Sequence, residues 1–393
     1  MKILHICLAC LYIEGMSYQE NIIPRKNREE GHTVFILAGT RTLSHNNVPV
    51  VAEPCKDKSV DNGIKLTRIS PIYRPKLFRF FHVPNKFPNI SNYLEEKRPD
   101  IVFIHGSEFG NANEIIQYKK NNPFTKVYLD SHQDMINSSF HGSKIKQKFI
   151  RFAFGIQARK ISKICETVWG VTPGRCDYLT RIYRVDPSKV KLLLMGFDES
   201  YLKQISTSLF NREAARKMLG CDEETTLIVS GGKIDDKKAI VELCQAFADI
   251  NVSNTKLVIF GEANNETEQR LKTYFHNDSI VFCGWKNSLE IAELFSIADL
   301  AVFPGTHSVL WEQAVAQCLP SIFRRFPMMN QDDIGGNCIY INDGTPKSIG
   351  AALSSILLNP SLLQSMKEAA RKPAHLNFYY GTISKQAIGE IDK

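Results

Sequence analysis

Short apolar runs alternate with helical patterns along the first half of the chain. Each run is rich in β-branched and aliphatic residues, and the segment after it carries apolar residues at helical spacing. The runs lie at residues 2–8, 33–38, 101–105, 126–130, 168–172 and 190–194. Because continuous apolar strands between helices are typical of parallel sheets covered on both faces, the pattern predicts an α/β fold.

The second half repeats this alternation. Its runs lie at residues 227–231, 256–261, 280–283, 299–304, 320–323 and 338–341. Between the halves, residues 198–224 form a polar segment with one short helical pattern and no strand-like run. We therefore expect two doubly wound, Rossmann-like domains that face each other across a cleft, formed by residues 1–197 and 198–375. Ligands of such sheets bind beyond the carboxyl ends of the strands, so the loops after the strands are expected to carry the chemistry.

The composition narrows the class of protein. With 393 residues, 43% of them hydrophobic, the chain is long enough for two separate cores. Its ten cysteines are scattered, and the close pair Cys7 and Cys10 has no second pair to complete a zinc site or a disulfide scaffold. The run at 2–8 is interrupted by a histidine and lacks a small-residue cleavage site, which favours a strand over a secretory leader. No apolar stretch approaches the roughly 20 residues that span a bilayer. We expect a cytoplasmic protein, either soluble or peripheral to a membrane.

Charge is distributed unevenly along the chain, whose net charge is +8. Residues 1–197 hold 30 Lys+Arg against 17 Asp+Glu, whereas residues 198–393 hold 19 against 24. The acid-free stretch 144–163, "KIKQKFIRFAFGIQARKISK", has the pattern of a basic amphipathic helix. Such a helix could lie on the anionic inner face of a plasma membrane or could simply be a solvated helix, and the sequence leaves both open. We expect no nucleic-acid partner, because no nucleic-acid module accompanies the charge.

Two loops that follow predicted strands have the composition of anion-binding sites. Gly15, in "LYIEGMSYQEN", precedes a helix whose N-terminal N–H groups could face an anion, although a plain turn is the simpler reading. In "SGGKIDDKKAI", Gly231 and Gly232 permit a tight turn, and Lys233 and Lys238 follow it. Paired cations beside a glycine turn suit a diphosphate, while two solvated lysines are the alternative.

Two further loops carry carboxylates. In "PGTHSVLWEQAVAQCLP", at 304–320, Glu312 stands among apolar residues on a predicted half-buried helix. N–H groups of Ser308 and Val309 could bind an anion, and Glu312 could accept two hydrogen bonds from a ribose diol or could face solvent. The segment "DSHQD", at 130–134, holds three titratable side chains, but no spacing supplies the further ligand that a metal site would need.

Taken together, these motifs resemble the GT-B glycosyltransferases, and within them family 4, the retaining group that uses nucleotide sugars. The resemblance runs nearly end to end. Its supports are "YIEGMSYQEN", "GHTVFIL", "DSHQD", "GVTPGRCDYL", "LLLMGFD", "GGKIDDKKAI", "LVIFG", "IVFCGW" and "DLAVFPGTHSVLWEQAVAQCLP". It also implies that the last helical pattern, within 376–393, returns to the first domain, and that no metal or other cofactor is needed because cations and helix dipoles stabilise the leaving diphosphate.

The resemblance assigns roles to individual residues of the donor site. Lys233 and Lys238 would grip the diphosphate and act in catalysis. Glu312, also expected to be catalytic, would be the second glutamate of the family's Glu, seven residues, Glu motif, which binds ribose. The remaining donor-binding residues implied are Gly15, Gly232, Trp285, Thr306, His307, Ser308 and Val309. The first motif glutamate is missing, since Pro304 stands at its place, so Thr306, His307 and Ser308 supply the sugar contacts or donor specificity differs.

On the acceptor side, the resemblance implies that His132 is catalytic and lies near the sugar and the acceptor, with Asp130 and Asp134 beside it. We therefore expect a cytoplasmic, retaining hexosyltransferase that moves a sugar from a nucleotide-sugar donor to a hydroxyl of a glycan, lipid-linked in our interpretation, in surface polysaccharide biosynthesis. A sugar-nucleotide epimerase on the same fold and a degenerate nucleotide-binding scaffold subunit of a glycan synthase are the alternatives. A pyridoxal-type phosphorylase would need a Schiff-base lysine and a far longer chain.

Overall fold

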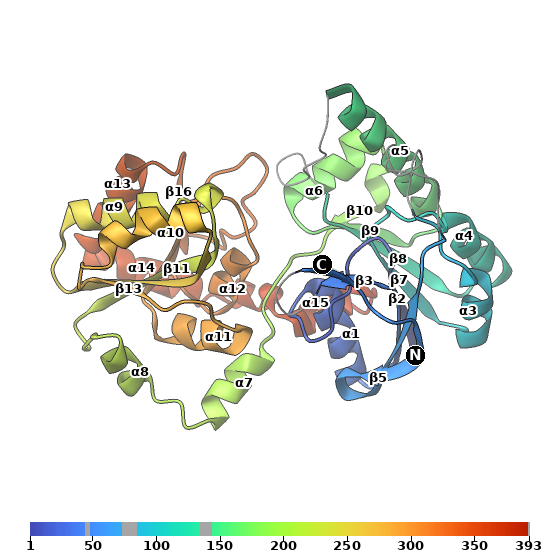
Figure 1. The fold of residues 1–393 in the computed structure, drawn as a ribbon, viewed down its shortest axis with the longest axis horizontal. Helices are drawn as coiled ribbons and strands as arrows, with labels where there is room; N and C mark the ends of the chain where they lie inside the picture. Colours follow the sequence, from blue (N-terminus) through green and yellow to red (C-terminus); the bar gives the residue numbers. More distant parts are fainter. Residues whose placement is uncertain (44–47, 73–84, 134–143, 392–393) are drawn as a thin grey trace. The chain divides into compact units, whose positions relative to one another are not determined.

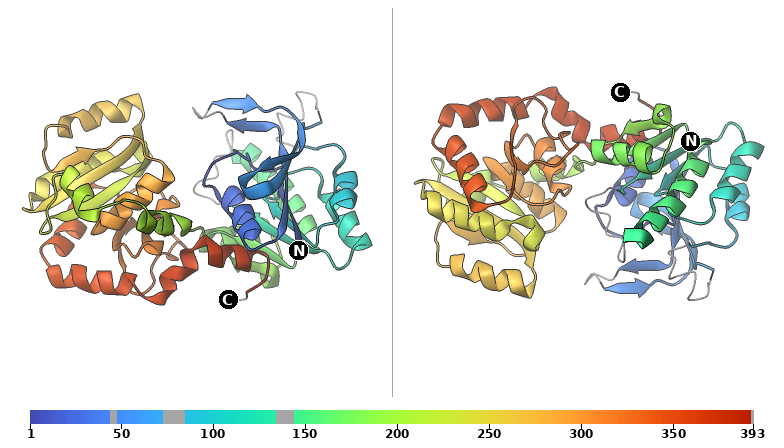
Figure 2. Two further views of the ribbon diagram at one scale, coloured as in Figure 1. Left: turned by 90° about the horizontal axis from the view of Figure 1, so that it is seen from below. Right: turned by 90° about the horizontal axis from the view of Figure 1, so that it is seen from above.

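The computed structural model describes residues 1–43, 48–72, 85–133 and 144–391 (Figure 1). The chain divides into two compact units, one formed by Met1–Leu194 with Tyr380–Lys393 and the other by Met195–Tyr379. The sequence had placed these boundaries after residue 197 and at residue 376. Both units are α/β layers with helices on the two sides of a sheet, as Figure 2 shows.

The first unit is built on an eight-stranded sheet with the order β10-β9-β8-β7-β1-β2-β6-β5. Every neighbouring pair is parallel except β5 with β6. The strands are β1 (Lys2–Cys7), β2 (Thr33–Gly39), β5 (Cys55–Val60), β6 (Ile64–Ile69), β7 (Ile101–His105), β8 (Lys126–Ser131), β9 (Thr167–Gly170) and β10 (Val190–Leu192). A separate antiparallel pair is formed by β3 (Arg41–Leu43) and β4 (Pro49–Val51). The strand order reverses between β1 and β7, which makes their carboxyl ends the ligand crevice of this sheet.

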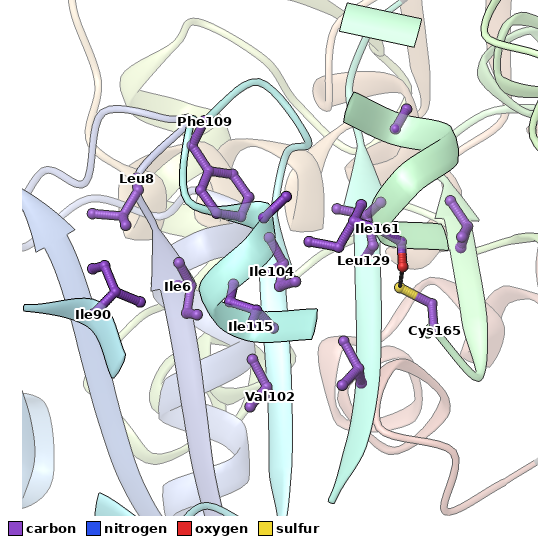
Figure 3. Packing of buried hydrophobic residues seen from close by; sticks show 14 of the residues in the cluster. Ile6, Leu8, Ile90, Val102, Ile104, Phe109, Ile115, Leu129, Ile161 and Cys165 are labelled. Carbon is purple, nitrogen blue, oxygen red and sulfur yellow. Dashed lines mark hydrogen bonds between the residues drawn. The ribbon is translucent and has the colours of Figure 1, made fainter. Parts of the chain in front are cut away.

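Helices cover both faces of this sheet and bury its apolar side chains. They are α1 (Gln19–Glu29), α3 (Ile90–Lys97), α4 (Ala112–Asn121), α5 (Lys144–Ser162), α6 (Pro173–Asp177) and α15 (Tyr380–Ala387). On one face, α3, α4 and α5 contribute Ile90, Ile115 and Ile161 to a core with Ile6 and Ile104 of the strands (Figure 3). A smaller cluster, which includes Val34, Ile36 and Leu66, forms the core of the opposite face.

The antiparallel strand β5 was not expected from the sequence. Its residues, CKDKSV, alternate between half-buried and exposed and contain no continuous apolar run. At an edge of the sheet, β5 needs only one apolar face, and it is paired to β6 through residues such as Val60 with Ile64. The parallel strand β6 and the short pair β3 and β4 were not expected either. The α/β fold with parallel sheets is confirmed.

The second unit has a six-stranded, wholly parallel sheet with the order β13-β12-β11-β14-β15-β16. The strands are β11 (Thr226–Ile234), β12 (Thr255–Ala263), β13 (Ile280–Phe282), β14 (Leu300–Phe303), β15 (Ser321–Arg324) and β16 (Cys338–Ile341). The helices are α7 (Ser200–Thr207), α8 (Arg212–Met218), α9 (Ile240–Ile250), α10 (Asn265–Leu271), α11 (Ser288–Ile297), α12 (Leu310–Ala316), α13 (Pro346–Leu357) and α14 (Pro360–Ala370). This is the Rossmann order, and its reversal falls between β11 and β14.

The C-terminal helix α15 belongs to the first unit, as expected. It packs on α1, and Trp169 of β9 donates from its indole Nε1 to the carbonyl of Ala387 at 3.1 Å. Within the second unit, the segments that enter and leave it lie side by side, because Phe197 forms a parallel bridge with Tyr379. In the part of the chain that the structure describes, no helix is both long and apolar enough to cross a membrane.

Candidate active site

The first candidate site lies at the carboxyl ends of β11 and β14, where the strand order of the second unit reverses. The strand β11 runs further than the sequence predicted, because it continues past Gly231 to Ile234 in register with β12. Gly231 and Gly232 are therefore strand residues and do not form the expected tight turn. A Cβ atom at Gly231 would overlap the carbonyl of Phe260, and Gly232 has φ +108°, so glycine is required for the close approach of the two strands.

The two lysines expected to bind a diphosphate have different environments. Lys233 lies on β11 with an exposed side chain and stands opposite Glu262 in the strand register. Lys238 follows in the short helical turn after β11 and is half-buried. Its ammonium donates to the carbonyl oxygens of Thr306 at 2.7 Å and His307 at 3.3 Å. Burial lowers the pKa of Lys238 from its ordinary value, and the nearby charge of Asp235 opposes this shift.

The loop after β14 is clamped onto the turn that carries Lys238. The amide of Thr306 donates to the carbonyl of Lys237 at 2.8 Å, in addition to the two bonds from the Lys238 ammonium. Gly305 has to be glycine, because a Cβ atom there would overlap the backbone of Lys237 and Lys238. Two of the three N–H groups of Lys238 thus fix the loop, which leaves one for a ligand.

Glu312 is fully buried in α12, neither facing solvent nor presented to an open pocket. Its Oε1 lies 2.8 Å from Nε2 of His307 and accepts at 3.4 Å from Nε2 of Gln331. Beside this pair, Trp311 is fully buried, meets the His307 ring edge-on with centroids 5.1 Å apart, and stacks on Phe323. In this conformation His307 contacts Oε1 and no part of the Glu312 side chain is exposed; the expected contact with a ribose stays a prediction.

A second buried acid, Asp332, lies beside Glu312 and was not found from the sequence. It is fully buried, and neither of its carboxylate oxygens, nor Oε2 of Glu312, has a hydrogen-bond partner among the described residues. Burial, with the charge of Glu312, raises the pKa of Asp332 well above its ordinary value. Ligand atoms of His307, Glu312 and Asp332 lie within 4.8 Å of one another, so these are the side chains of this unit that could hold a metal ion.

The other expected donor residues of this unit are more dispersed. Thr306 and Ser308 are half-buried, and Val309 directly precedes α12, where no side chain caps the helix. Trp285 is 68% exposed in the loop after β13, two strands away from β11 in the sheet. The structure therefore brings the 304–309 loop together with Lys238 and keeps Trp285 off the point where the strand order reverses.

In the first unit, Gly15 lies in the loop between β1 and α1 with φ +77°, and a Cβ atom there would touch nothing within 4 Å. Its backbone angle, not crowding, is the reason for glycine. Because α1 begins at Gln19, Gly15 stands several residues ahead of the helix N-terminus.

Asp130 lies near the end of β8, and His132 directly follows this strand at its carboxyl end. His132 is partly exposed, with 40% of its side chain accessible, and its Nε2 lies 3.6 Å from Oδ2 of Asp130. Asp130 is fully buried; its Oδ1 accepts from the amide of Gly106 at 3.1 Å, and its Oδ2 lies 3.0 Å from Nδ1 of His105. Both carboxylate oxygens of Asp130 are thus enclosed, and its expected contact with an acceptor stays a prediction. Asp134, the third expected acceptor residue, lies outside the described residues.

Residues 211–373 match the model of the family described as glycosyl transferases group 1. HepE from Anabaena, solved in complex with UDP, is 13% identical over 99% of both chains with a TM-score of 0.68. A glycosyltransferase from Rickettsia africae ESF-5 is 11% identical over 99% of this chain and 97% of its own, with a TM-score of 0.66. WaaG, described as a glycosyltransferase involved in lipopolysaccharide biosynthesis, is 16% identical over 98% of both chains, with a TM-score of 0.65. No protein with a curated description matches the chain.

The chain has the fold of the GT-B glycosyltransferases, and its residues 211–373 match the group 1 glycosyl transferases. The matching segment contains β11, the loop 304–309 and the buried cluster of His307, Glu312 and Asp332. Pro304, which stands where the first motif glutamate was expected, is buried beside Gly344. It offers no side-chain donor or acceptor, so polar contacts from this loop can come only from residues such as Thr306 and Ser308.

The first unit exposes an apolar stripe on α5. Phe149, Phe152 and Ile156 are 52%, 63% and 44% exposed and fall on one face at helical spacing. Lys148 and Lys160 are exposed at the borders of the same face. We call these five residues the α5 stripe. Their arrangement fulfils the expectation of an amphipathic helix with cations beside its apolar face.

Proposed function

We propose that this protein is a glycosyltransferase that takes its sugar from a nucleotide-sugar donor and transfers it, with retention, to a hydroxyl group of a glycan. The observation that carries the proposal is the Lys238 clamp, in which one half-buried ammonium joins the two loops at the strand reversal of the second unit. Ligands of open α/β sheets bind at this position. Support also comes from HepE, which has the same fold and was solved with UDP and with UDP-glucose.

In this proposal, Lys238 stabilises the negative charge that develops on the leaving diphosphate. A half-buried cation is effective in this role because little water competes for it and because its position is fixed before the reaction begins. Lys233, exposed on the adjacent strand, adds a second positive charge, and the amides of Ser308 and Val309 add neutral donors. With charge supplied in this way, transfer needs no metal or other cofactor.

Glu312 keeps a place in the proposed site, but it acts through His307. The 2.8 Å contact holds the His307 ring, whose backbone carbonyl in turn accepts from Lys238. We propose that Glu312 is a positioning residue that links α12 to the clamp and that a direct ribose contact would require His307 to move. Thr306 and Ser308 take the sugar contacts that the missing glutamate would have made.

We further propose that the α5 stripe docks the enzyme on the anionic inner face of a membrane, where a lipid-linked acceptor would be presented for surface polysaccharide biosynthesis in the cytoplasm. Exposed phenylalanine and isoleucine side chains can enter the interfacial region, while the flanking lysines meet anionic headgroups. The excess of basic residues in 1–197 supports this orientation of the first unit towards anionic partners.

Calorimetry with UDP-, GDP- and ADP-sugars tests the donor site. Lys238→Ala should weaken binding of the accepted donor about 10-fold or more, because a hydrogen bond to a charged group contributes about 1.5–3 kcal/mol. Lys237→Ala is the matched control, since this neighbouring side chain is exposed and only its backbone carbonyl contacts Thr306. Equal affinities of the two variants, or no binding of any nucleotide sugar, would refute the proposed site.

A second candidate function is that of a nucleotide-binding scaffold subunit. The missing motif glutamate favours it. Mass spectrometry of donor turnover with and without lipid-linked acceptors separates the candidates. A transferase consumes the donor in the presence of an acceptor and yields an extended glycan. A scaffold binds the donor without turnover, and an epimerase converts it without any acceptor.

A further inference from the structure

A chain of buried polar side chains crosses the sheet of the first unit at its strand reversal. Asn27 of α1 contacts His5 of β1, which contacts His105 of β7, which contacts Asp130 of β8. The successive distances are 3.1 Å from Asn27 Oδ1 to His5 Nε2, 3.2 Å from His5 Nδ1 to His105 Nε2, and 3.0 Å from His105 Nδ1 to Asp130 Oδ2. None of the four side chains is more than 2% exposed. The chain ends beside the partly exposed His132.

These polar groups lie in apolar surroundings, where an unsatisfied polar atom is costly. The rings of His5 and His105 are stacked with centroids 5.4 Å apart, and Phe103 is tilted against both. Every ring nitrogen of the two histidines nevertheless has a partner within 3.2 Å. Complete satisfaction of two buried histidines indicates a functional or organising role, since apolar residues would pack there at lower cost.

The hydrogen bonds determine where the protons lie. With the Asn27 amide oriented so that Oδ1 faces the ring, His5 donates from Nε2 and presents a lone pair at Nδ1. His105 must then donate from Nε2 to His5 and from Nδ1 to Asp130, which requires an imidazolium. The electrostatics agree, because burial and the neighbouring His105 lower the pKa of His5 well below its ordinary value. Burial also opposes charging of His105, but the neighbouring Cys7 and Asp130 outweigh it and raise its pKa to about 9.

The carboxylate at the end of the chain cannot turn. Its Oδ1 is held by the amide of Gly106, and its Oδ2 by the ring of His105. Burial alone would raise the pKa of Asp130, but the charged ring of His105 holds it well below its ordinary value, so the group is ionised and can only accept hydrogen bonds. The His132 nitrogen that faces it is Nε2, at 3.6 Å.

We propose that His5 and His105 are positioning residues for His132, and that the ion pair of His105 with Asp130 holds the His132 ring in the tautomer that carries its proton on Nε2. The Nδ1 atom of His132 is then left as a hydrogen-bond acceptor on the partly exposed side of the ring, where it can orient the hydroxyl group that receives the sugar. The role of His132 at the acceptor rests on the function proposed above. The tautomer itself does not, because it follows from the contacts of Asp130.

Nitrogen-15 NMR of the full chain, labelled at its ten histidines, tests this inference directly. Ring resonances are assigned by single His→Gln variants. The expected spectrum shows both nitrogens of His105 protonated, His5 and His132 protonated at Nε2, and an unprotonated Nδ1 on His132. A His132 ring that exchanges between both tautomers in the unaltered protein would overturn the proposal, as would a neutral His105 with its Nε2 unprotonated.

Variants separate positioning from mere packing. His105→Phe keeps an aromatic ring but removes both donors, and we expect it to release His132 into a mixture of tautomers. His105→Gln, which can still donate to Asp130, should restore much of the Nε2-protonated form. Asp130→Asn supplies an independent test if His105→Phe fails to fold, because an amide that presents its NH₂ group to His132 should reverse the tautomer. An unchanged His132 spectrum in folded His105→Phe or Asp130→Asn would refute the proposal.

Kinetics distinguish this inference from the proposed function. If both hold, His105→Phe lowers kcat at least about 10-fold, as part of the roughly 10²–10⁴-fold that a positioned proton acceptor contributes, and leaves KM for the donor unchanged. The His132 tautomer could respond to the variants as expected while His132→Gln retains full transfer. That outcome would refute the acceptor role and leave the positioning chain intact. Transfer that depends on His132 but a tautomer that ignores His105 and Asp130 would refute the chain alone.

Discussion

Nε2 of His307 lies 2.8 Å from Oε1 of Glu312, and both side chains are almost completely enclosed. The pair joins the loop after β14 to the helix α12, and the same loop accepts both bonds from Lys238. Glu312, whose carboxylate was expected to contact a ribose, is therefore part of the framework that holds the site.

Replacement of Glu312 should affect stability before it affects chemistry. Glu312→Ala leaves His307 without its partner in a buried site, and we expect a loss of about 3 kcal/mol or more in the free energy of unfolding. Glu312→Gln keeps an acceptor and should cost clearly less. Gln313→Ala, on the same helix but half-buried, is the control. Urea unfolding followed by circular dichroism measures all three, and equal stability of Glu312→Ala and Gln313→Ala would contradict this role.

Asp332→Asn should stabilise the protein at neutral pH. Because the pKa of Asp332 is raised in the folded state, the folded protein keeps this proton above the pH at which the unfolded chain releases it. Stability therefore falls as pH rises from the unfolded pKa towards the raised folded one. The asparagine amide does not titrate, so the stability of the variant should not fall with pH in this way. At the upper end of this pH range the variant should therefore be more stable than the unaltered protein. Melting temperatures across pH 4 to 8, or about that range, provide the measurement; parallel curves for the two proteins would be inconsistent with a raised pKa.

Gly305→Ala should damage the clamp. The added methyl group would overlap the backbone of Lys237 and Lys238, so the loop has to move away from the turn that holds it. We expect a loss of about 2 kcal/mol or more in stability and weaker nucleotide-sugar binding. Gly350→Ala is the control, because a Cβ atom at Gly350 in α13 makes only ordinary contacts, and alanine in a helix favours folding by up to about 1 kcal/mol. Similar binding and stability of both variants would argue against a rigid clamp.

The α5 stripe should bind anionic vesicles in a salt-dependent manner. Flotation with vesicles of phosphatidylglycerol and phosphatidylcholine should recover the protein at low salt and release it as salt rises, since screening weakens the lysine contribution. Phe152→Ser and Lys148→Ala should each reduce recovery. Phe124→Ser is the matched control, because this residue is 95% exposed in the turn before β8. Absence of binding at low salt would refute membrane docking by this face.

Much of the fold could be predicted because parallel strands buried on both faces carry continuous apolar runs. Strand β5 was not predicted, because its sequence CKDKSV has no such run. Its residues form a strand by pairing with the neighbouring strand β6. The extension of β11 through Gly231 and Gly232 was missed for a related reason. From the local sequence these glycines were interpreted as a turn, whereas the close approach of β12 requires them within the strand.

The candidate site was harder to predict, because its decisive contacts join residues far apart in the sequence. Lys238 and the 304–309 loop were each recognised from their own segments, and the strand order then brought them together. His5 was noticed only as an interruption of an apolar run, and its contact with His105, 100 residues away, leaves no local pattern. Asp130 was placed beside the acceptor from its neighbours in sequence, but the burial of its carboxylate depends on β7.

The bridge between Phe197 and Tyr379 has a consequence for biogenesis. The second unit is an insertion whose two ends meet, so residues 195–379 have the topology of a segment that can fold as soon as it leaves the ribosome. The first unit has to wait, because α1 stays uncovered and Trp169 lacks its acceptor until residue 387 has been synthesised. The first unit, most of which is synthesised earlier, is therefore completed last.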